Sequence, residues 1–510
     1  MSDSLWFYGD ELFSTLSAWP ASYSDTPDHI PLIFIKQVLD IITGPLVYIF
    51  NLSFMRAEVP NRWKLSLVTP LPKKPPFTSP LNYRPISITS IFARAFEKIL
   101  KKRIEKHLQE HAIISPFQHG FQKGRSTVTA MIQSLNDWTV NADHGHNTDV
   151  VFLDFCKAFD KVPHDKLLAK LDRIGIHPRI IGWIQAFLSD RIFIVRVGSG
   201  FSRPRRVTSG VPQGGVLSPI LFNIYTYELP LLVSTVGVNC CAFADDFKIY
   251  SKSSDCLALQ NAIDIVHNWS KEWEIPLSEE KTKLMHIGPK NNCHRYVIGG
   301  TPIKVVDKIK DLGFLVTSDL DFDQHCEQIA AKAMGLMYKL FRALVTRDCM
   351  VLLRAFKTYI RPLLEYGTVI FSPHKRKVSD KLEKVQNSFT RKLFIRKVGF
   401  FYDRIPSFKE RNMNLGLHSL SWRRRKFDLL MFHKIIHGHT GLDPENYFSF
   451  RPSITRGGSR KLCLPRARLK CRSNFFINRA GSDYLALSRV QAIPSSLRSF
   501  KNTLRSYLKS

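Results

Sequence analysis

Alternating apolar and polar positions predict a strand–turn–strand hairpin over residues 240–250. Apolar residues recur at every second position on either side of two adjacent acids, Asp245 and Asp246, a pattern typical of half-buried strands. The two carboxylates then stand at the hairpin tip, where they repel each other unless a cation lies between them. Ligands that are all oxygen favour a hard ion such as Mg²⁺. An exposed turn explains this stretch equally well when it is considered alone.

A second apolar run also ends on an acid. Residues 150–153 are continuously apolar and predict a buried strand, which Asp154 follows directly. A carboxylate at the end of a buried strand needs a cation or a hydrogen-bond donor, so Asp154 joins Asp245 and Asp246 as a candidate metal ligand. We expect Asp160, in the next turn, to cap or brace that turn.

Much of the remaining pattern is helical. Residues 1–67 carry apolar residues at helical spacing, with a break expected at Pro45. A further helix is expected from Ile91 to about Leu108, and the chain beyond about residue 322 is helical and basic. Further short strands are expected at the start of 68–76, at 192–197 and at 310–316. These elements together predict an α+β fold.

Composition points to a polyanionic partner. The 510 residues include 74 Lys and Arg against 43 acids, a formal net charge of +31, which favours nucleic acid over a membrane. Basic residues interleaved with aromatic ones at 423–426 and 466–472 suit contact with a nucleic-acid strand. Nine cysteines without a CxxC pair support neither a disulfide framework nor a zinc ribbon. We expect a soluble, intracellular protein without a membrane partner.

Three basic residues lie on neighbouring extended segments. Lys73 and Lys74 follow the short strand that begins at Val68, and Arg84 lies just beyond them. Together they could clamp a triphosphate, Arg84 bidentately and the lysines as point charges. A solvated basic loop is the alternative reading of the same residues.

Two Gly-containing segments suit contact with a nucleic-acid strand. The first carries Gln118, Phe121 and Arg125 just before an expected helix, and offers an aromatic face and helix-end amides. The second carries Gln213 and Gly214, where glycine allows close approach of a base or sugar. A helix-capping loop and a simple turn are the respective alternatives.

Five short motifs in a fixed order identify a family. They are Asn-Tyr-Arg-Pro-Ile-Ser at 82–87, Gln-His-Gly-Phe at 118–121, Leu-Asp-Phe-Cys-Lys-Ala-Phe-Asp-Lys-Val-Pro at 153–163, Ser-Gly-Val-Pro-Gln-Gly at 209–214 and Phe-Ala-Asp-Asp at 243–246. In this order they resemble the reverse transcriptase of non-LTR (LINE-type, jockey-like) retrotransposons. The resemblance extends from about Pro27 to the C-terminus and includes residues 359–367.

The resemblance implies a right-hand polymerase with an antiparallel palm sheet, followed by a basic helical region. We expect a helical N-terminal extension at 1–67, fingers and palm at 68–316, a thumb-like helical region at 317–400 and a basic C-terminal region at 401–510.

The resemblance also implies roles for individual residues. Asp154 and Asp245 would bind two Mg²⁺ ions, with Mn²⁺ as an alternative, and Asp246 would assist. Lys281 resembles the proton donor to pyrophosphate. Phe159 resembles the family's gate against a 2′-hydroxyl. Phe155, Gln213, Arg84 and Lys73 or Lys74 would lie on the nucleotide side, and Gln118, Phe121, Arg125 and Gly214 on the nucleic-acid side.

The implied function is an RNA-directed DNA polymerase that extends a DNA primer with deoxynucleotides (dNTPs) on an RNA template. The alternative is a nucleic-acid-binding remnant that keeps the fold without turnover. About 67 residues precede the polymerase motifs, and we expect no endonuclease within them, so target nicking would need an endonuclease in trans.

Overall fold

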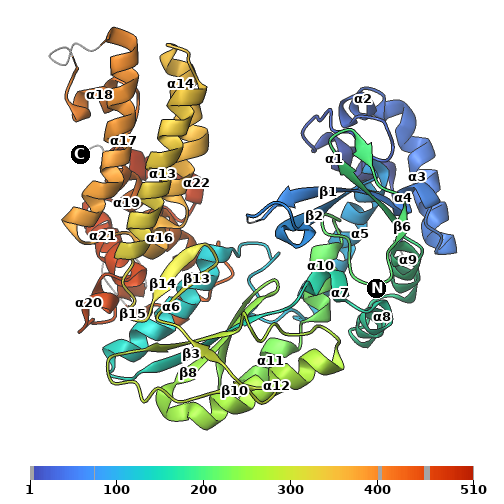
Figure 1. The fold of residues 1–510 in the computed structure, drawn as a ribbon, viewed down its shortest axis with the longest axis horizontal. Helices are drawn as coiled ribbons and strands as arrows, with labels where there is room; N and C mark the ends of the chain where they lie inside the picture. The colour runs from blue at the N-terminus through green and yellow to red at the C-terminus, as the bar shows by residue number, and fades with distance from the viewer. Residues whose placement is uncertain (1–4, 74, 400–404, 453–459, 509–510) are drawn as a thin grey trace.

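A five-stranded sheet in the order β12–β9–β3–β8–β7, here called the central sheet, lies below the two arms of the molecule (Figure 1). The computed structural model describes residues 5–73, 75–399, 405–452 and 460–508. β3 pairs antiparallel with β8 and β9, β7 pairs antiparallel with β8, and the short β12 runs parallel to β9. The strands are β3 (Thr148–Asp154), β7 (Asn239–Phe243), β8 (Asp246–Lys252), β9 (Lys283–Ile287) and β12 (Lys304–Val305). The predicted strand and hairpin are confirmed.

The side chains of β3 alternate between two apolar cores. Val151 and Leu153 belong to one core, which the helices α10 to α12 also enter, and Val150 and Phe152 belong to the other, shared with α6 and the C-terminal helices. The helices are α6 (Thr127–Asp143), α10 (Ser218–Tyr225), α11 (Leu229–Ser234) and α12 (Cys256–Glu272). Burial on both faces explains why this strand is continuously apolar.

A second sheet builds the arm that rises on the right of Figure 1. β1 pairs antiparallel with β2 and parallel with β4, and the short strands β5 and β6 both pair with β4. The strands are β1 (Leu65–Pro72), β2 (Tyr83–Thr89), β4 (Ile192–Val197), β5 (Gly200–Phe201) and β6 (Arg205–Arg206).

The N-terminal helices pack into the core of this arm. Phe7, Phe50 and Phe54 surround Phe96, whose ring stacks on Trp183 with centroids 4.2 Å apart. The helices are α1 (Gly9–Ser17), α2 (Leu32–Gln37), α3 (Leu39–Arg56), α5 (Ile91–Glu110) and α9 (Pro178–Leu188). The N-terminal segment thus shares a core with the arm, and the boundary at residue 67 stays a prediction.

The break expected at Pro45 is wrong, because α3 runs through this residue without interruption. Proline removes the hydrogen bond to the carbonyl four residues earlier, here that of Ile41. Both residues are exposed, so that carbonyl is open to water. Burial of Phe50 and Phe54 on the other side of the helix outweighs the local cost.

The single strand expected over 310–316 is instead a hairpin. β13 (Lys308–Asp311) pairs antiparallel with β14 (Phe314–Thr317). Leu312 and Gly313 between them have φ angles of 47° and 93°, and two left-handed residues make the tight turn that suits twisted strands.

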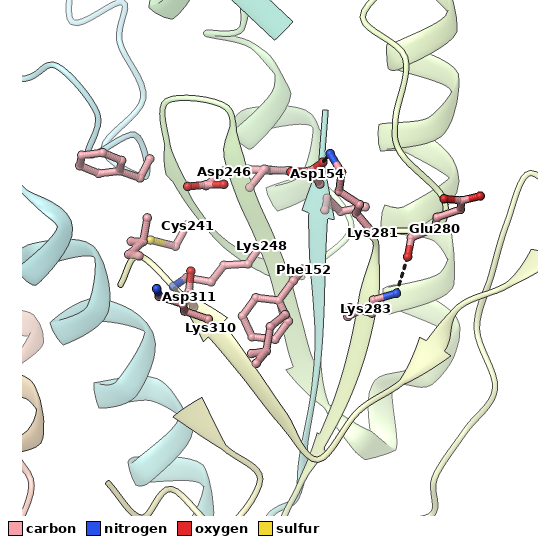
Figure 2. A pocket seen from close by; sticks show the side chains of 15 residues that line it. Phe152, Asp154, Cys241, Asp246, Lys248, Glu280, Lys281, Lys283, Lys310 and Asp311 are labelled. Atoms are coloured by element: carbon pink, nitrogen blue, oxygen red, sulfur yellow. Dashed lines mark hydrogen bonds and ion pairs between the residues drawn. The ribbon is translucent and has the colours of Figure 1, made fainter. Parts of the chain in front are cut away.

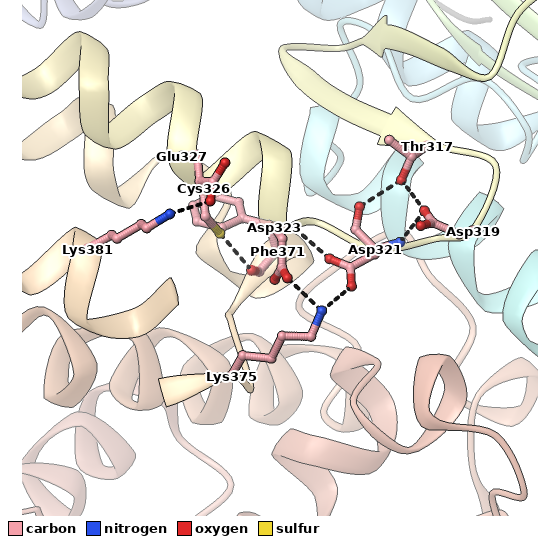
Figure 3. A network of polar contacts seen from close by, with 9 residues as sticks. All are labelled: Thr317, Asp319, Asp321, Asp323, Cys326, Glu327, Phe371, Lys375 and Lys381. Carbon is pink, nitrogen blue, oxygen red and sulfur yellow. Dashed lines mark hydrogen bonds and ion pairs between the residues drawn. The ribbon is translucent and has the colours of Figure 1, made fainter. Parts of the chain in front are cut away.

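Helices build the second arm, on the left of Figure 1. They are α13 (Asp323–Ala343), α14 (Cys349–Ala355), a π-helical turn at Phe356–Ile360, α15 (Arg361–Glu365), α16 (Thr368–Phe371), α17 (Arg376–Val398), α18 (Phe408–Asn414), α19 (Leu420–Ile436), α20 (Lys470–Ser473), α21 (Phe476–Val490) and α22 (Leu497–Tyr507). At the base of this arm Lys375 forms ion pairs of 2.7 and 2.6 Å with Asp321 and Asp323, which join the starts of α13 and α17 (Figure 3).

Several basic residues expected at a nucleic-acid surface hold this arm together instead. Arg424 and Arg472 are each only 4% exposed. Arg472 donates to Asn136 and Thr139 of α6, while Arg423 and Arg425 pair with the acids Glu365 and Asp483. A run of basic residues in a sequence does not show whether their side chains face solvent or form internal ion pairs of this kind. Among the described helices, none is both long and apolar enough to cross a membrane.

Candidate active site

The strand register brings two of the predicted carboxylates together. Asp154 at the end of β3 lies opposite Asp246 at the start of β8. Asp246 also pairs with Phe243 across the hairpin, so Ala244 and Asp245 form a two-residue turn at its tip. All three acids therefore lie at one end of the central sheet.

The hairpin tip is braced by Gln118, which sequence reasoning placed on the nucleic-acid side. Its Oε1 accepts hydrogen bonds from the backbone N–H groups of Ala244 (2.9 Å) and Gly120 (2.7 Å). Ala244 adopts a left-handed φ of 57°, which is unfavourable for alanine unless the surroundings hold it. A Cβ at Gly120 would lie 2.3 Å from the nitrogen of Ala244, so only glycine fits there. Gln118 thus positions the acids from behind.

Burial and mutual repulsion shift the carboxylate pKa values. Burial is the main cause of the raised pKa of Asp245, and the charge of Asp154 adds to it. Burial also raises the pKa of Asp246 to about 6, reinforced by the charges of Asp245, Asp311 and Asp154. A cation between these groups would relieve the repulsion.

Lys281 occupies one side of this acidic cluster. Its Nζ donates a hydrogen bond of 2.6 Å to Oδ2 of Asp154 (Figure 2), and this bond is the main cause of the raised pKa of Lys281. The backbone N–H of Ser278 also donates to the carbonyl of Asp154, at 2.8 Å. The segment before β9 is thereby tied to the end of β3.

A pocket of about 360 Å³ opens beside Asp154 and Asp246 (Figure 2). Lys248, two residues beyond Asp246 on the same face of β8, forms a buried ion pair of 2.5 Å with Asp311 of β13. This pair fixes the β13–β14 hairpin against the central sheet. Sequence reasoning missed it, because the partners are 63 residues apart and no periodic pattern links them.

The acids supply the right ligand chemistry for Mg²⁺ without forming a closed ligand set. Among the described residues, no group of three or more His, Cys, Asp or Glu side chains is arranged to hold a metal ion. The oxygen donors of Asp154, Asp245 and Asp246 suit a hard divalent cation, but Asp154 is engaged by Lys281. Assignment of these residues as metal ligands stays a prediction.

The two phenylalanines after Asp154 take different places. Phe159 stacks on Phe222 of α10 with ring centroids 4.3 Å apart and meets the half-exposed Phe121 edge-on. Phe155 is only 6% exposed and packs edge-on against Trp269. The side chain of Phe155 is therefore part of the apolar core, which argues against its predicted contact with a nucleotide.

Gln213 is held on both sides. Its Nε2 donates to Oδ1 of Asp160 at 2.9 Å, and its carbonyl accepts a 2.7 Å bond from the N–H of Ser87 on β2. The Asp160 side chain thus braces the loop of Gln213, and its expected role in its own turn stays a prediction. Gly214 has a φ of 112°, and a Cβ there would lie 2.6 Å from the carbonyl oxygen of Ser87, so glycine is needed for packing.

Two of the three residues of the predicted phosphate clamp lie close enough to the acidic cluster to act on it. Lys73 and Arg84 are exposed, and their charges oppose the rise in the pKa of Asp245, so both act electrostatically on the acidic cluster. Lys74 lies outside the described residues. Arg125, predicted to contact nucleic acid, instead donates to the carbonyl oxygens of Pro116 and Gly441 and ties its loop to the C-terminal arm.

Comparisons with known proteins agree with the geometry. Residues 71–316 match the reverse transcriptase (RNA-dependent DNA polymerase) family. The chain is 26% identical over 399 residues to a probable RNA-directed DNA polymerase from transposon BS and 24% identical over 399 residues to the RNA-directed DNA polymerase from mobile element jockey, both of Drosophila melanogaster. These matches cover 74% and 75% of this chain but 43% of each relative, so the chain spans about two-fifths of their length.

A solved structure of apo telomerase from Candida tropicalis aligns with a TM-score of 0.37 and 12% identity, over 52% of this chain and 55% of that one. The family match and the strand topology confirm the right-hand polymerase fold expected from the motifs. The chain thus carries a reverse transcriptase domain, of the nucleotidyltransferase class, and is similar to the RNA-directed DNA polymerases of non-LTR (LINE-type, jockey-like) retrotransposons.

Proposed function

We propose that this chain extends a DNA primer with dNTPs on an RNA template by two-metal-ion nucleotidyl transfer. The observation that carries the proposal is the pairing of Asp154 with Asp246 across β3 and β8, with Asp245 at the adjoining turn. Three carboxylates at one end of a rigid sheet offer the charge that two divalent cations require. Rigid strands also hold the ligands more accurately than loops do.

The acids would hold two Mg²⁺ ions, or Mn²⁺, which when bound activate the primer 3′-hydroxyl and neutralise the leaving pyrophosphate. Asp154 and Asp245 would be the main ligands, and Asp246 would assist. Lys281 leaves Asp154 when the site is loaded and donates a proton to pyrophosphate. A lysine is protonated at neutral pH, and the bond to Asp154 raises the pKa of Lys281 further as long as that bond exists.

Other residues would select and orient the nucleotide. Phe159 is supported from behind by Phe222, so its ring can act as a fixed wall against a 2′-hydroxyl. Gln213 would contact the incoming nucleotide or the template, and Lys73 and Arg84 would bind the triphosphate. A nucleic-acid-binding remnant without turnover is the less favoured reading, since all three acids are intact.

Primer extension by the purified chain tests this proposal. The assay uses a DNA primer labelled at its 5′ end and annealed to an RNA template, with and without Mg²⁺. Lengthening of the labelled primer measures extension. Extension that depends on both dNTPs and Mg²⁺ is expected. We also expect no nicking of supercoiled plasmid by this chain, because the buried apolar residues of 5–67 pack into the shared core of the arm.

A further inference from the structure

Glu97 of α5 is a carboxylate with no exposed surface, in a helix face shared with Phe96, Ile99 and Leu100. Burial raises its pKa, and a buried carboxylate is strongly unfavourable without partners. Its presence in this apolar environment therefore calls for a specific role.

The partners of Glu97 lie in a distant part of the chain. Its Oε2 accepts hydrogen bonds from the backbone N–H groups of Val216 (2.8 Å) and Leu217 (2.9 Å), at the N-terminus of α10. Leu217 is the residue before the helix, and no side chain of its own segment caps the helix. The first N–H groups of a helix need acceptors, and its positive end favours an anion. The donors are the two residues immediately before Ser218, so Glu97 caps α10 from just outside the helix, 120 residues away along the chain.

Arg191 ties this cap to the second sheet. The charges of Arg191 and Arg94 both attract the Glu97 carboxylate. Arg191 is only 1% exposed and donates to Oγ of Ser66 on β1 at 3.1 Å. The cap therefore links α5, α10 and the strands of the arm into one buried unit.

Both residues proposed to face the nucleotide depend on the position of α10. Phe222 of α10 supports the ring of Phe159, and Gln213 lies in the loop that leads directly into this helix. A shift of the helix start would move the support of Phe159 and displace the end of the loop that carries Gln213. Asp160 and Ser87 also hold this loop. Misplacement by about 1 Å is enough to lower turnover strongly.

We infer that Glu97 is a positioning residue, which fixes the start of α10 and thereby places Gln213 and Phe159 against the incoming deoxynucleotide. The inference rests on the proposed function. Glu97 does not touch the nucleotide, so its effect should appear in nucleotide affinity and sugar selectivity rather than in binding of the template–primer.

The test compares Glu97→Ala, Glu97→Gln and Leu108→Ala, the last a core truncation further along α5 that lowers stability without touching the cap. Glu97→Ala should raise KM for dNTP about ten- to hundredfold, as expected when the groups that orient a substrate are misplaced by about 1 Å, and should lower selectivity for deoxyribonucleotides. Glu97→Gln keeps an acceptor oxygen and should restore most of the affinity. Leu108→Ala should leave KM within about twofold.

Hydrogen exchange gives a readout that does not need turnover. In Glu97→Ala the amides of Val216 and Leu217 should lose protection, while those of α12 keep theirs. An unchanged KM with unchanged protection, or an equal rise in KM in Leu108→Ala, would overturn the inference. If the wild-type chain extends no primer, the proposed function fails, and exchange alone decides whether Glu97 caps the helix.

Discussion

Lys281 donates a 2.6 Å hydrogen bond to Asp154, so a lysine ammonium lies against the carboxylate that we propose as a metal ligand. In this arrangement the Lys281 ammonium partly neutralises the charge of the Asp154 carboxylate. Loading of the site with metal and triphosphate would free the lysine to act on pyrophosphate.

Replacement of Lys281 by Gln should therefore have two opposite effects. Turnover should fall about 100-fold or more, as expected for loss of a general acid, while the Mg²⁺ concentration for half-maximal extension should fall, because Asp154 loses a competing cation. The neighbouring Lys283→Gln is the control, since the Lys283 ammonium donates to the backbone carbonyl of Glu280. A higher Mg²⁺ requirement in Lys281→Gln would contradict the competition.

Phe159→Val should raise incorporation of ribonucleotides relative to deoxyribonucleotides, because the smaller side chain leaves room for a 2′-hydroxyl. The ratio of kcat/KM for the two nucleotides measures the effect. Phe155→Val is the matched control, since Phe155 lies in the core against Trp269 and should lower stability without changing the ratio. Equal ratios in wild type and Phe159→Val would show that Phe159 only packs.

Asp149 gives a pH dependence of stability. This buried carboxylate accepts hydrogen bonds from His286 Nδ1 (2.7 Å), Tyr296 OH (2.6 Å) and Asn291 Nδ2 (2.8 Å). Burial alone would raise its pKa, but these bonds outweigh burial and lower the pKa below its usual value.

The stabilisation that the ionised Asp149 carboxylate contributes is therefore fully present above about pH 4, near its pKa in the unfolded chain. This stabilisation is lost as the pH falls toward the lower pKa of Asp149 in the folded protein. Asp149→Asn should cost about 1–3 kcal/mol in the free energy of unfolding near pH 7. The cost should shrink below pH 4. Urea unfolding at several pH values measures it, and a cost that grows on acidification would be contrary to this account.

The exposed arginines of α14 and the preceding loop should grip the template–primer through phosphates. Arg347 and Arg354 are exposed on the left arm of Figure 1, in contrast to the paired arginines of α19. Replacing both by Gln should flatten the slope of log affinity against log salt by about one to two units. Arg425→Gln, which removes an internal pair with Asp483, is the control and should leave the slope unchanged. Equal slopes in the wild type, the double variant and Arg425→Gln would place the nucleic acid elsewhere.

Local pattern predicted the central part of the site well. The continuous apolar run before Asp154 and the alternating run around Asp245 each predict a strand, and the strands form there. Contacts between distant segments were not predictable, because a single sequence carries no signal for them. Gln118 was expected on the nucleic-acid side and is a buried brace. Glu97, for which the local pattern made no prediction, is a buried cap.

The most direct test of the account is the rate of single-nucleotide primer extension, measured together with template–primer affinity, for Asp154→Asn and Asp245→Asn. Asp264→Asn, at an exposed position of α12 on the other side of the sheet, is the matched control. The account predicts that extension falls by at least about 1,000-fold in the first two proteins, with affinity for the template–primer nearly unchanged and with full activity in the control. Extension at near wild-type rate by either Asp154→Asn or Asp245→Asn would contradict the proposed metal site.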